Sequence, residues 1–142
     1  MDKRFWIAGI VASVLVIALG FVVHAVLLTD DYMNYKHLFR TEEDAMANMP
    51  LMMLAHIIMG FALAWIYGQG VKNEGSWLGQ GLRFGIATTL LVTVPWYLIY
   101  YSVQPWGRRV IAKQIVLDGI SMIIVSLVVA YIYKSKGTTV EV

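Results

Sequence analysis

The sequence predicts an all-α integral membrane protein whose four helices form an antiparallel bundle with up-down topology. Of the 142 residues, 59% are hydrophobic and only 14% are charged, and the mean hydropathy is +0.68. Four apolar runs fill most of the chain, each close to the roughly 20 residues that a helix needs to cross the hydrocarbon core. Short polar joints separate the runs. We therefore expect residues 1–142 to form a single membrane domain.

The first run, Phe5 to Leu28, contains no charged residue. A basic start followed by an apolar stretch also occurs in secretory signals. This run, however, exceeds the length of a signal's apolar region and has no convincing cleavage site of small residues. We expect it to be a retained span.

The second run, Pro50 to Gly68, opens with a proline, which suits the first turn of a helix because the missing N–H has no partner there. The third run, Phe84 to Tyr101, contains Pro95. A proline inside a helix predicts a kink, and a neighbouring hydroxyl such as that of Thr93, or water, is expected to bond the freed carbonyl. Glycines fill the joint of residues 69–81, which predicts a turn.

The fourth run, Ile111 to Tyr133, carries Lys113 near its start and Asp118 inside it. The longest joint is the loop of residues 29–49, between the first two spans. Within it, Thr41-Glu-Glu-Asp44 resembles a helix N-terminal capping motif and predicts a short surface helix leading into the second span. Aromatic residues gather near the ends of the runs, as in an interfacial belt.

The charges exclude some functions and indicate a location. A net charge of +2, spread along the chain, predicts contact with the lipid bilayer and not with nucleic acid. Four spans put both termini on one side of the membrane, together with six of the eleven basic residues. These six are Lys3, Arg4, Lys72, Arg83, Lys134 and Lys136, and the other five are Lys36, Arg40, Arg108, Arg109 and Lys113. This small excess predicts cytoplasmic termini.

Small residues recur every three or four positions in each span and predict close helix packing. The stripes are Gly9, Ser13, Gly20 and His24 in the first span, His56, Gly60, Ala64 and Gly68 in the second, Gly81, Gly85, Thr89, Thr93, Tyr97 and Tyr101 in the third, and Gln114, Asp118, Met122, Ser126 and Ala130 in the fourth. Because small residues let helix backbones approach in lipid, we expect these stripes to face one another. A self-associating bundle, or packing against other membrane subunits, is expected as well.

Strongly polar side chains are rare inside the spans, and they lie at similar depths. His24, His56 and Asp118 lie about 6, 9 and 10 Å from the run ends that antiparallel helices would place on the side away from the termini. Tyr97 lies near the same end of its own run, and Gln114 precedes Asp118 by one helical turn. A charge within the membrane costs at least about 2.5–3.5 kcal/mol and normally finds a partner. We therefore predict one polar cluster of these five residues.

Four interpretations of this cluster remain open. In the first, it is a hydrogen-bonded knot in a non-catalytic structural or accessory subunit. In the second, Asp118 carries protons in a small proton-coupled transporter. In the third, His24 and His56 ligate one haem b, or a quinone lies beside Tyr97 and Trp96. In the fourth, the thioethers of Met49 and Met53 bind copper together with His56.

The sequence favours no enzymatic activity and predicts no catalytic residue. With no cysteine in the chain, thiolate ligands, thiol nucleophiles and disulfides are excluded. Phosphate-binding, dinucleotide-binding, serine-hydrolase and zinc-protease motifs are likewise missing from the sequence.

Several short motifs resemble those of an uncharacterised family of small four-span bacterial membrane proteins. The motifs are Gly20 with His24, Asp31-Tyr-Met-Asn-Tyr35, Met49-Pro-Leu51, Gly79-Gln-Gly-Leu-Arg-Phe-Gly85 and Val94-Pro95. The resemblance spans nearly the whole chain, although most of its residues are glycines and prolines that determine packing and turns. It implies a four-helix bundle in a bacterial inner membrane and assigns no catalytic or ligand-binding residue.

Overall fold

The computed structural model describes residues 3–71 and 75–134, and this part of the chain is helical without strands. Four helical segments are long and apolar enough to cross a membrane: Lys3–Leu27, Glu42–Gly70, Trp77–Val103 and Arg108–Tyr133. The expected class, an all-α protein with four candidate membrane spans, is therefore confirmed at this level.

Two of the four segments change their helical winding part of the way along. The first consists of α1 (Lys3–Phe21) and the π-helix η1 (Val22–Leu27). The third consists of α4 (Trp77–Thr88), the π-helix η3 (Thr89–Thr93) and α5 (Val94–Val103). The second and fourth segments are the single α-helices α3 (Glu42–Gly70) and α6 (Arg108–Tyr133).

The second span begins earlier than its apolar run, so the prediction that Pro50 opens this helix is wrong. Thr41 caps α3, and its hydroxyl accepts a hydrogen bond from the backbone N–H of Asp44 at 3.3 Å. The helix then continues through Pro50, which removes one backbone hydrogen bond without ending the helix. The capping motif thus starts the span itself and not a separate surface helix.

The other joints are also shorter than predicted. Within residues 29–49, α2 (Thr29–Tyr32) and the 3₁₀-helix η2 (Met33–Leu38) precede α3. In the third span, α4 already starts at Trp77, where the Ser76 hydroxyl accepts from the Gly79 N–H at 3.4 Å. Gly79 and Gly81, predicted to form a turn, therefore lie inside α4, and the small size of Gly81 allows close packing on Ala130.

The third span, in which Pro95 was predicted to cause a kink, changes its helical winding just before the proline. The π-helix η3 ends just ahead of Pro95, and the Thr89 hydroxyl donates to the Gly85 carbonyl at 2.8 Å. Four residues of an α-helix turn through about 400°, so a stripe of residues spaced by four drifts about 40° at each step. Each residue of the wider π turn rotates less about the helix axis, which offsets part of this drift. Thr93 therefore stays buried, as Gly85 is.

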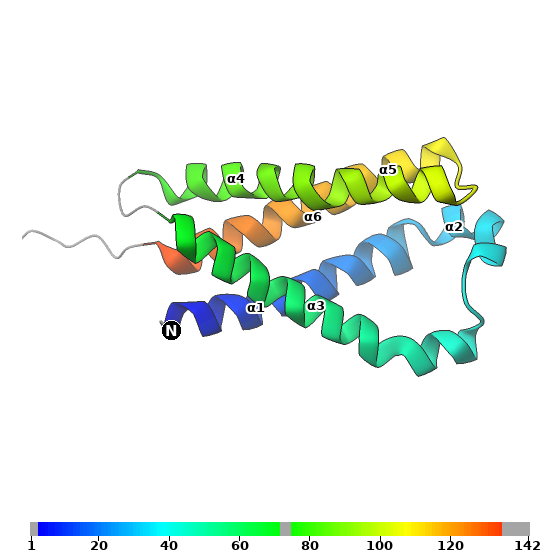
Figure 1. The fold of residues 1–142 in the computed structure, drawn as a ribbon, viewed down its shortest axis with the longest axis horizontal. Helices are drawn as coiled ribbons and strands as arrows, with labels where there is room; N and C mark the ends of the chain where they lie inside the picture. Colours follow the sequence, from blue (N-terminus) through cyan, green and yellow to red (C-terminus); the bar gives the residue numbers. More distant parts are fainter. Residues whose placement is uncertain (1–2, 72–74, 135–142) are drawn as a thin grey trace, which may run out of the picture.

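The helices pack as two pairs, α1 with α3 and α4 with α6, and α1 also packs on α6 (Figure 1). Small residues make these contacts. A Cβ atom on Gly60 would lie 2.6 Å from Ser13 Cα, and one on Gly81 would lie 2.7 Å from Ala130 Cβ. The small-residue stripes thus face one another within the chain, as predicted, and the close approach stabilises the bundle where lipid provides no hydrophobic drive.

The arrangement of the helix ends sets up two distinct ends of the molecule. The start of α1, the end of α3, the start of α4 and the end of α6 lie at one end, while α2 and the α5–α6 joint lie at the other (Figure 1). At the latter end Trp106 packs its ring against Tyr32, Tyr35 and Phe39 at centroid distances of 5.9, 5.1 and 5.6 Å. This aromatic cluster holds α2 against the end of α5 and the start of α6.

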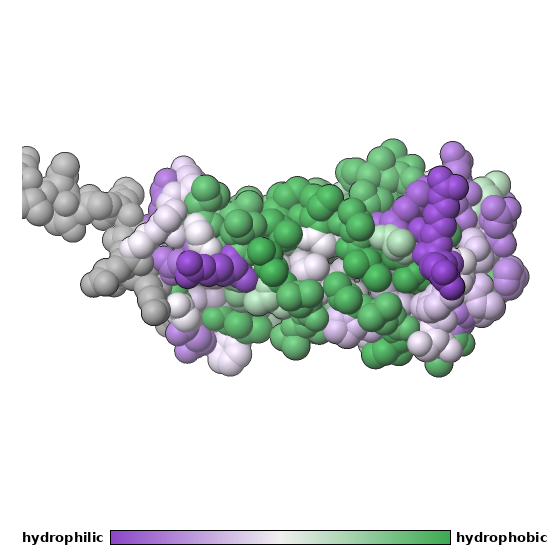
Figure 2. Space-filling view, turned by 90° about the horizontal axis from the view of Figure 1, so that it is seen from above, coloured by the Kyte–Doolittle hydropathy of each residue, from purple (hydrophilic) through white to green (hydrophobic). Residues whose placement is uncertain are grey.

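The outer surface matches a bilayer in its pattern of hydropathy. On the face that Figure 2 shows, a broad hydrophobic belt covers the middle of the molecule and hydrophilic residues lie toward both ends. Large apolar side chains such as Val14, Ile58, Leu91 and Ile120 are more than half exposed on this belt. In water such a surface would be highly unfavourable, whereas lipid tails cover it without cost.

Candidate functional site

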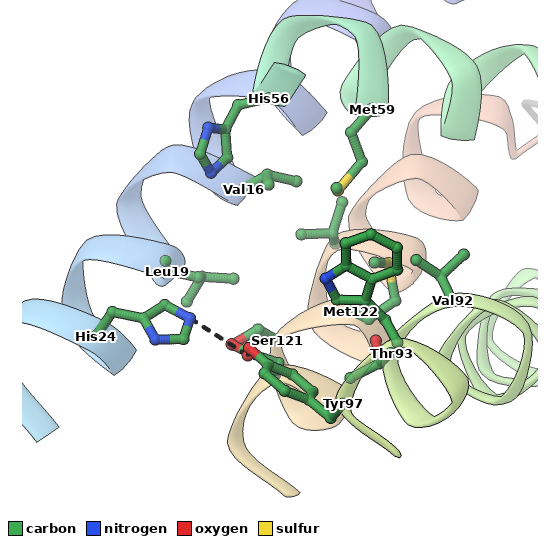
Figure 3. A pocket seen from close by; sticks show the side chains of 14 residues that line it. Val16, Leu19, His24, His56, Met59, Val92, Thr93, Tyr97, Ser121 and Met122 are labelled. Carbon is green, nitrogen blue, oxygen red and sulfur yellow. Dashed lines mark hydrogen bonds and ion pairs between the residues drawn. The ribbon is translucent and has the colours of Figure 1, made fainter. Parts of the chain in front are cut away.

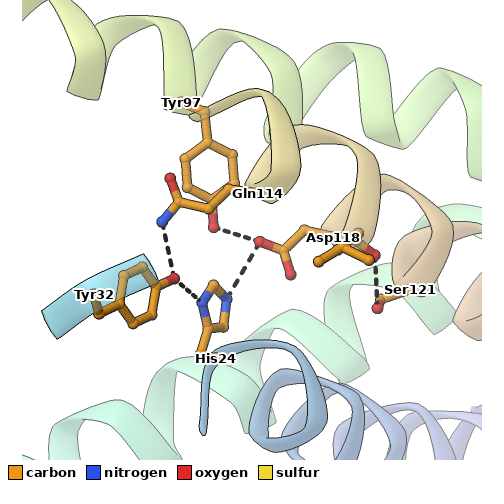
Figure 4. A network of polar contacts seen from close by, with 7 residues as sticks. His24, Tyr32, Tyr97, Gln114, Asp118 and Ser121 are labelled. Atoms are coloured by element: carbon orange, nitrogen blue, oxygen red, sulfur yellow. Dashed lines mark hydrogen bonds and ion pairs between the residues drawn. The ribbon is translucent and has the colours of Figure 1, made fainter. Parts of the chain in front are cut away.

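Five polar side chains from four segments converge at the end of the bundle that holds α2 (Figure 4). His24 comes from η1, Tyr32 from α2, Tyr97 from α5, and Gln114 and Asp118 from α6. We call these five residues the polar network. Four of them were predicted to lie together, and the structure brings those four together.

The contacts of the polar network form a continuous path. Gln114 Nε2 donates to the Tyr32 hydroxyl at 3.0 Å, and that hydroxyl lies 2.6 Å from His24 Nδ1. On the other side of the imidazole ring, His24 Nε2 lies 3.3 Å from Asp118 Oδ2, and the Tyr97 hydroxyl donates a short hydrogen bond to the same oxygen. Asp118 is thus approached by two groups from two other segments.

The chemistry of the partners indicates where the protons lie. An amide NH₂ only donates, so the Tyr32 oxygen accepts from Gln114 and its own O–H is available for His24 Nδ1. A neutral His24 then carries its proton on Nε2, facing the carboxylate of Asp118. In this arrangement every donor points along the path toward Asp118.

Burial differs along the polar network. Gln114 is buried, the Asp118 side chain is 18% exposed, and the His24 side chain is 39% exposed. The Gln114 Oε1 atom is buried without a hydrogen-bond partner. Burial raises the pKa of Tyr32 to about 12. The hydrogen bond from Gln114 opposes this rise, and the negative charges of Asp118 and Asp31 add to it. Tyr32 therefore stays a neutral hydroxyl that can both donate and accept near pH 7.

His56 is not part of the polar network, although it lines a cavity that the network also borders. Its Nδ1 lies 2.6 Å from the Met52 carbonyl oxygen, one turn earlier on its own helix. Its Nε2 faces α1, where a Cβ atom on Gly20 would lie 3.8 Å away. The prediction grouped His56 with His24 and Asp118, but its own backbone satisfies one ring nitrogen and the cavity lies between His56 and the polar network (Figure 3).

This cavity has a volume of about 210 Å³ and is lined by all four spans. Its lining is mostly apolar, with Val16, Leu19, Met59 and Met122 among the side chains, and Asp118 and both histidines add polar groups. Trp96 also lines the cavity, yet it is 57% exposed on the outside of the bundle. The cavity is therefore partly open to the outer surface on the side of Val92 and Trp96.

One ion pair supports the polar network from outside. Lys113 Nζ lies 2.9 and 2.6 Å from the two carboxylate oxygens of Asp31 and thereby joins α6 to α2. Asp31 immediately precedes Tyr32, so this pair helps to hold the tyrosine over His24. Neither Tyr32 nor this ion pair was predicted as part of the cluster. The available signal was the polar, aromatic sequence Asp31-Tyr-Met-Asn-Tyr35 only a few residues after His24.

The donor atoms do not fit the haem or copper interpretation. Both ring nitrogens of His24 already face partners, so haem ligation by His24 and His56 would break a contact of the polar network. Neither Met49 nor Met53 lines the cavity that His56 Nε2 faces. Within residues 3–71 and 75–134, no group of three His, Asp or Glu side chains is placed to hold a metal ion.

Comparison with known proteins adds nothing to this geometry, since no family model, curated protein or solved structure matches the chain.

Proposed function

We propose that this chain is an integral protein of a bacterial inner membrane, with four antiparallel spans and cytoplasmic termini. The four apolar helices and the hydrophobic belt support a membrane location. The arrangement of the helix ends supports antiparallel spans, and the six-to-five distribution of basic residues supports the orientation. The resemblance to small bacterial four-span proteins supports the kind of membrane.

Its proposed role is non-catalytic, as a structural or accessory subunit of a membrane complex or as a self-associating bundle. The polar network carries this proposal, because it joins η1, α2, α5 and α6 through groups that satisfy one another. Interhelical polar contacts in membranes contribute about 0.6–2 kcal/mol each, so such a network orders a bundle effectively. The carboxylate is held by Tyr97 and His24, as expected of a residue that fixes helix positions.

The stability of network variants tests this role. Asp118→Asn and Tyr97→Phe should each lower the unfolding midpoint of the purified protein in detergent. Ser121→Ala is the matched control, because the Ser121 hydroxyl donates only within α6, to the Leu117 carbonyl at 3.0 Å. Equal midpoints for all three variants and the wild type would refute a structural network.

The subunit role has a separate test. The protein, extracted from its native membrane with surrounding lipid, should show a mass above that of one 16.0 kDa chain, from copies of itself or from other membrane subunits. A single chain in every preparation would contradict the subunit proposal while leaving the structural network intact.

A second candidate is a small proton-coupled transporter in which Asp118 exchanges a proton for a ligand. The cavity favours it, since Asp118 lies both in the polar network and in the lining of a space that reaches the outer surface. Protein in lipid vesicles should then take up a substrate in response to a pH gradient and lose this uptake in Asp118→Asn. Absence of proton release on ligand binding would remove this candidate.

A further inference from the structure

We propose that the cavity between the spans is a binding site for an amphipathic organic cation, such as a primary amine on an aromatic or alkyl body, that enters from the lipid. The inference gives the transporter candidate its substrate class and goes beyond the structural role. It requires only binding, so it stands or falls separately from transport.

The charge of the lining favours a cation. Among the described residues that line the cavity, Asp118 is the one carboxylate, and no Lys or Arg side chain joins it. The nearby basic residue of α6, Lys113, is held by Asp31 outside the cavity. Tyr97 and His24 contact this carboxylate, but no Lys or Arg charge in the lining balances it, and such a carboxylate attracts a cation strongly where water and counterions are scarce. His24 is the titratable group that would compete with such a ligand for Asp118.

The hydrogen-bonding groups of the lining favour a ligand that donates. His56 Nδ1 faces the Met52 carbonyl, which only accepts, so this nitrogen carries the proton of a neutral ring. His56 Nε2 is then the acceptor of a ring that lines the same cavity as Asp118. An ammonium group presents several donors and can bond the acceptors that α3 and α6 contribute to the lining.

The shape and walls favour an amphipathic molecule of modest size. A volume of about 210 Å³ exceeds the roughly 150 Å³ that suffices to hold benzene in an apolar cavity. Apolar side chains from α1, α3 and α6 can enclose one ring or a short chain. The Trp96 indole at the rim adds a face that attracts cations, and its exposure provides a route from the lipid beside α5.

A pair of probes with the same body tests the proposal. We would titrate 4-phenylbutylamine and the neutral 4-phenylbutanol into the full-length protein in lipid nanodiscs, with empty nanodiscs to subtract partitioning into lipid. The wild type should bind the amine at least about tenfold more tightly than the alcohol, a difference that one strong charge contact readily provides. Asp118→Asn should remove this difference, and His56→Ala should weaken amine binding severalfold.

Rim variants keep the test decisive if Asp118→Asn fails to fold. Val92→Trp should fill the cavity from its rim and abolish saturable amine binding, because Val92 both lines the cavity and reaches the surface. Ile99→Trp is the matched control, since Ile99 is exposed on the same span outside the cavity lining. Equal affinity for amine and alcohol, equal effects of the two tryptophan variants, or no binding above empty nanodiscs would each overturn the proposal. Saturable binding without uptake into vesicles would support the site and contradict transport.

Discussion

Replacing Gly85 with alanine tests the close packing of α4 on α6. The added Cβ would lie 2.8 Å from Ile123 Cα and 3.2 Å from Ser126 Cβ. Carbon atoms in contact prefer about 3.5–4.0 Å, and a backbone atom cannot rotate away as a side-chain end can. The two helices must therefore move apart by roughly 1 Å, and the neighbouring contacts lose part of their attraction.

The expected magnitude follows from two opposing effects. Overpacking of this kind costs about 1–3 kcal/mol, while alanine gains about 0.5–1 kcal/mol over glycine inside a helix. Gly85→Ala should thus lower the free energy of unfolding by about 0.5–2 kcal/mol. Gly79→Ala, in the same helix, should raise that free energy by up to about 1 kcal/mol, because its nearest atom would be Ser76 Cβ at 4.0 Å.

The assay is reversible unfolding of the detergent-purified protein with increasing sodium dodecyl sulfate, followed by circular dichroism. The two variants should shift in opposite directions from the wild type. If Gly85→Ala is as stable as Gly79→Ala, the packing argument fails, since both changes alter helix propensity alike and differ only in the atoms that the new methyl group meets.

Four further predictions concern the end of the bundle that holds α2. Tyr32→Phe should destabilise the fold by about 1–3 kcal/mol, because it leaves buried Gln114 and His24 Nδ1 without a partner. The wild type should also lose stability as the pH rises from 10 toward 12. The pKa of Tyr32 is about 12 in the folded protein and has its ordinary value of 10.0 in the unfolded chain, so the unfolded chain releases the proton first and is favoured. This loss of stability should be smaller in Tyr32→Phe. A double-mutant cycle with Asp31→Asn and Lys113→Gln should give a coupling of about 0.2–1 kcal/mol that shrinks in high salt, because this ion pair is partly exposed; no coupling would contradict its role. Thr41→Ala should cost about 1 kcal/mol and speed hydrogen exchange at the Asp44 amide, whereas Thr41→Ser should preserve both.

The sequence predicted those features of the architecture that follow from the length and polarity of each segment. Four apolar runs of membrane length led to four helices, and their small-residue stripes correctly indicated which faces meet. Counting residues inward from the run ends brought His24, Tyr97, Gln114 and Asp118 to one place, because the depth of a residue in a helix follows directly from the rise per residue.

Other features depend on information that hydropathy lacks. The depth of His56 was estimated from Pro50, but α3 runs on from Thr41 and diverges from α5, so a similar depth did not bring His56 into the polar network. Depth also carries no information on the loops. Tyr32 reaches the polar network because α2 folds back over the helix ends, and this depends on its packing against Trp106 and on the ion pair of Asp31.

The two π-helical segments have a consequence for labelling experiments. In a scan that places one reporter residue after another along residues 77–103, accessibility to lipid should repeat with the period of an α-helix up to residue 88. The wider turn of residues 89–93 should then shift the phase of the pattern, so that positions 94–103 follow a wave offset from the first. The same offset is expected after residues 22–27. A helical wheel drawn without this offset would assign Trp96 and Tyr97 to the wrong faces of the span.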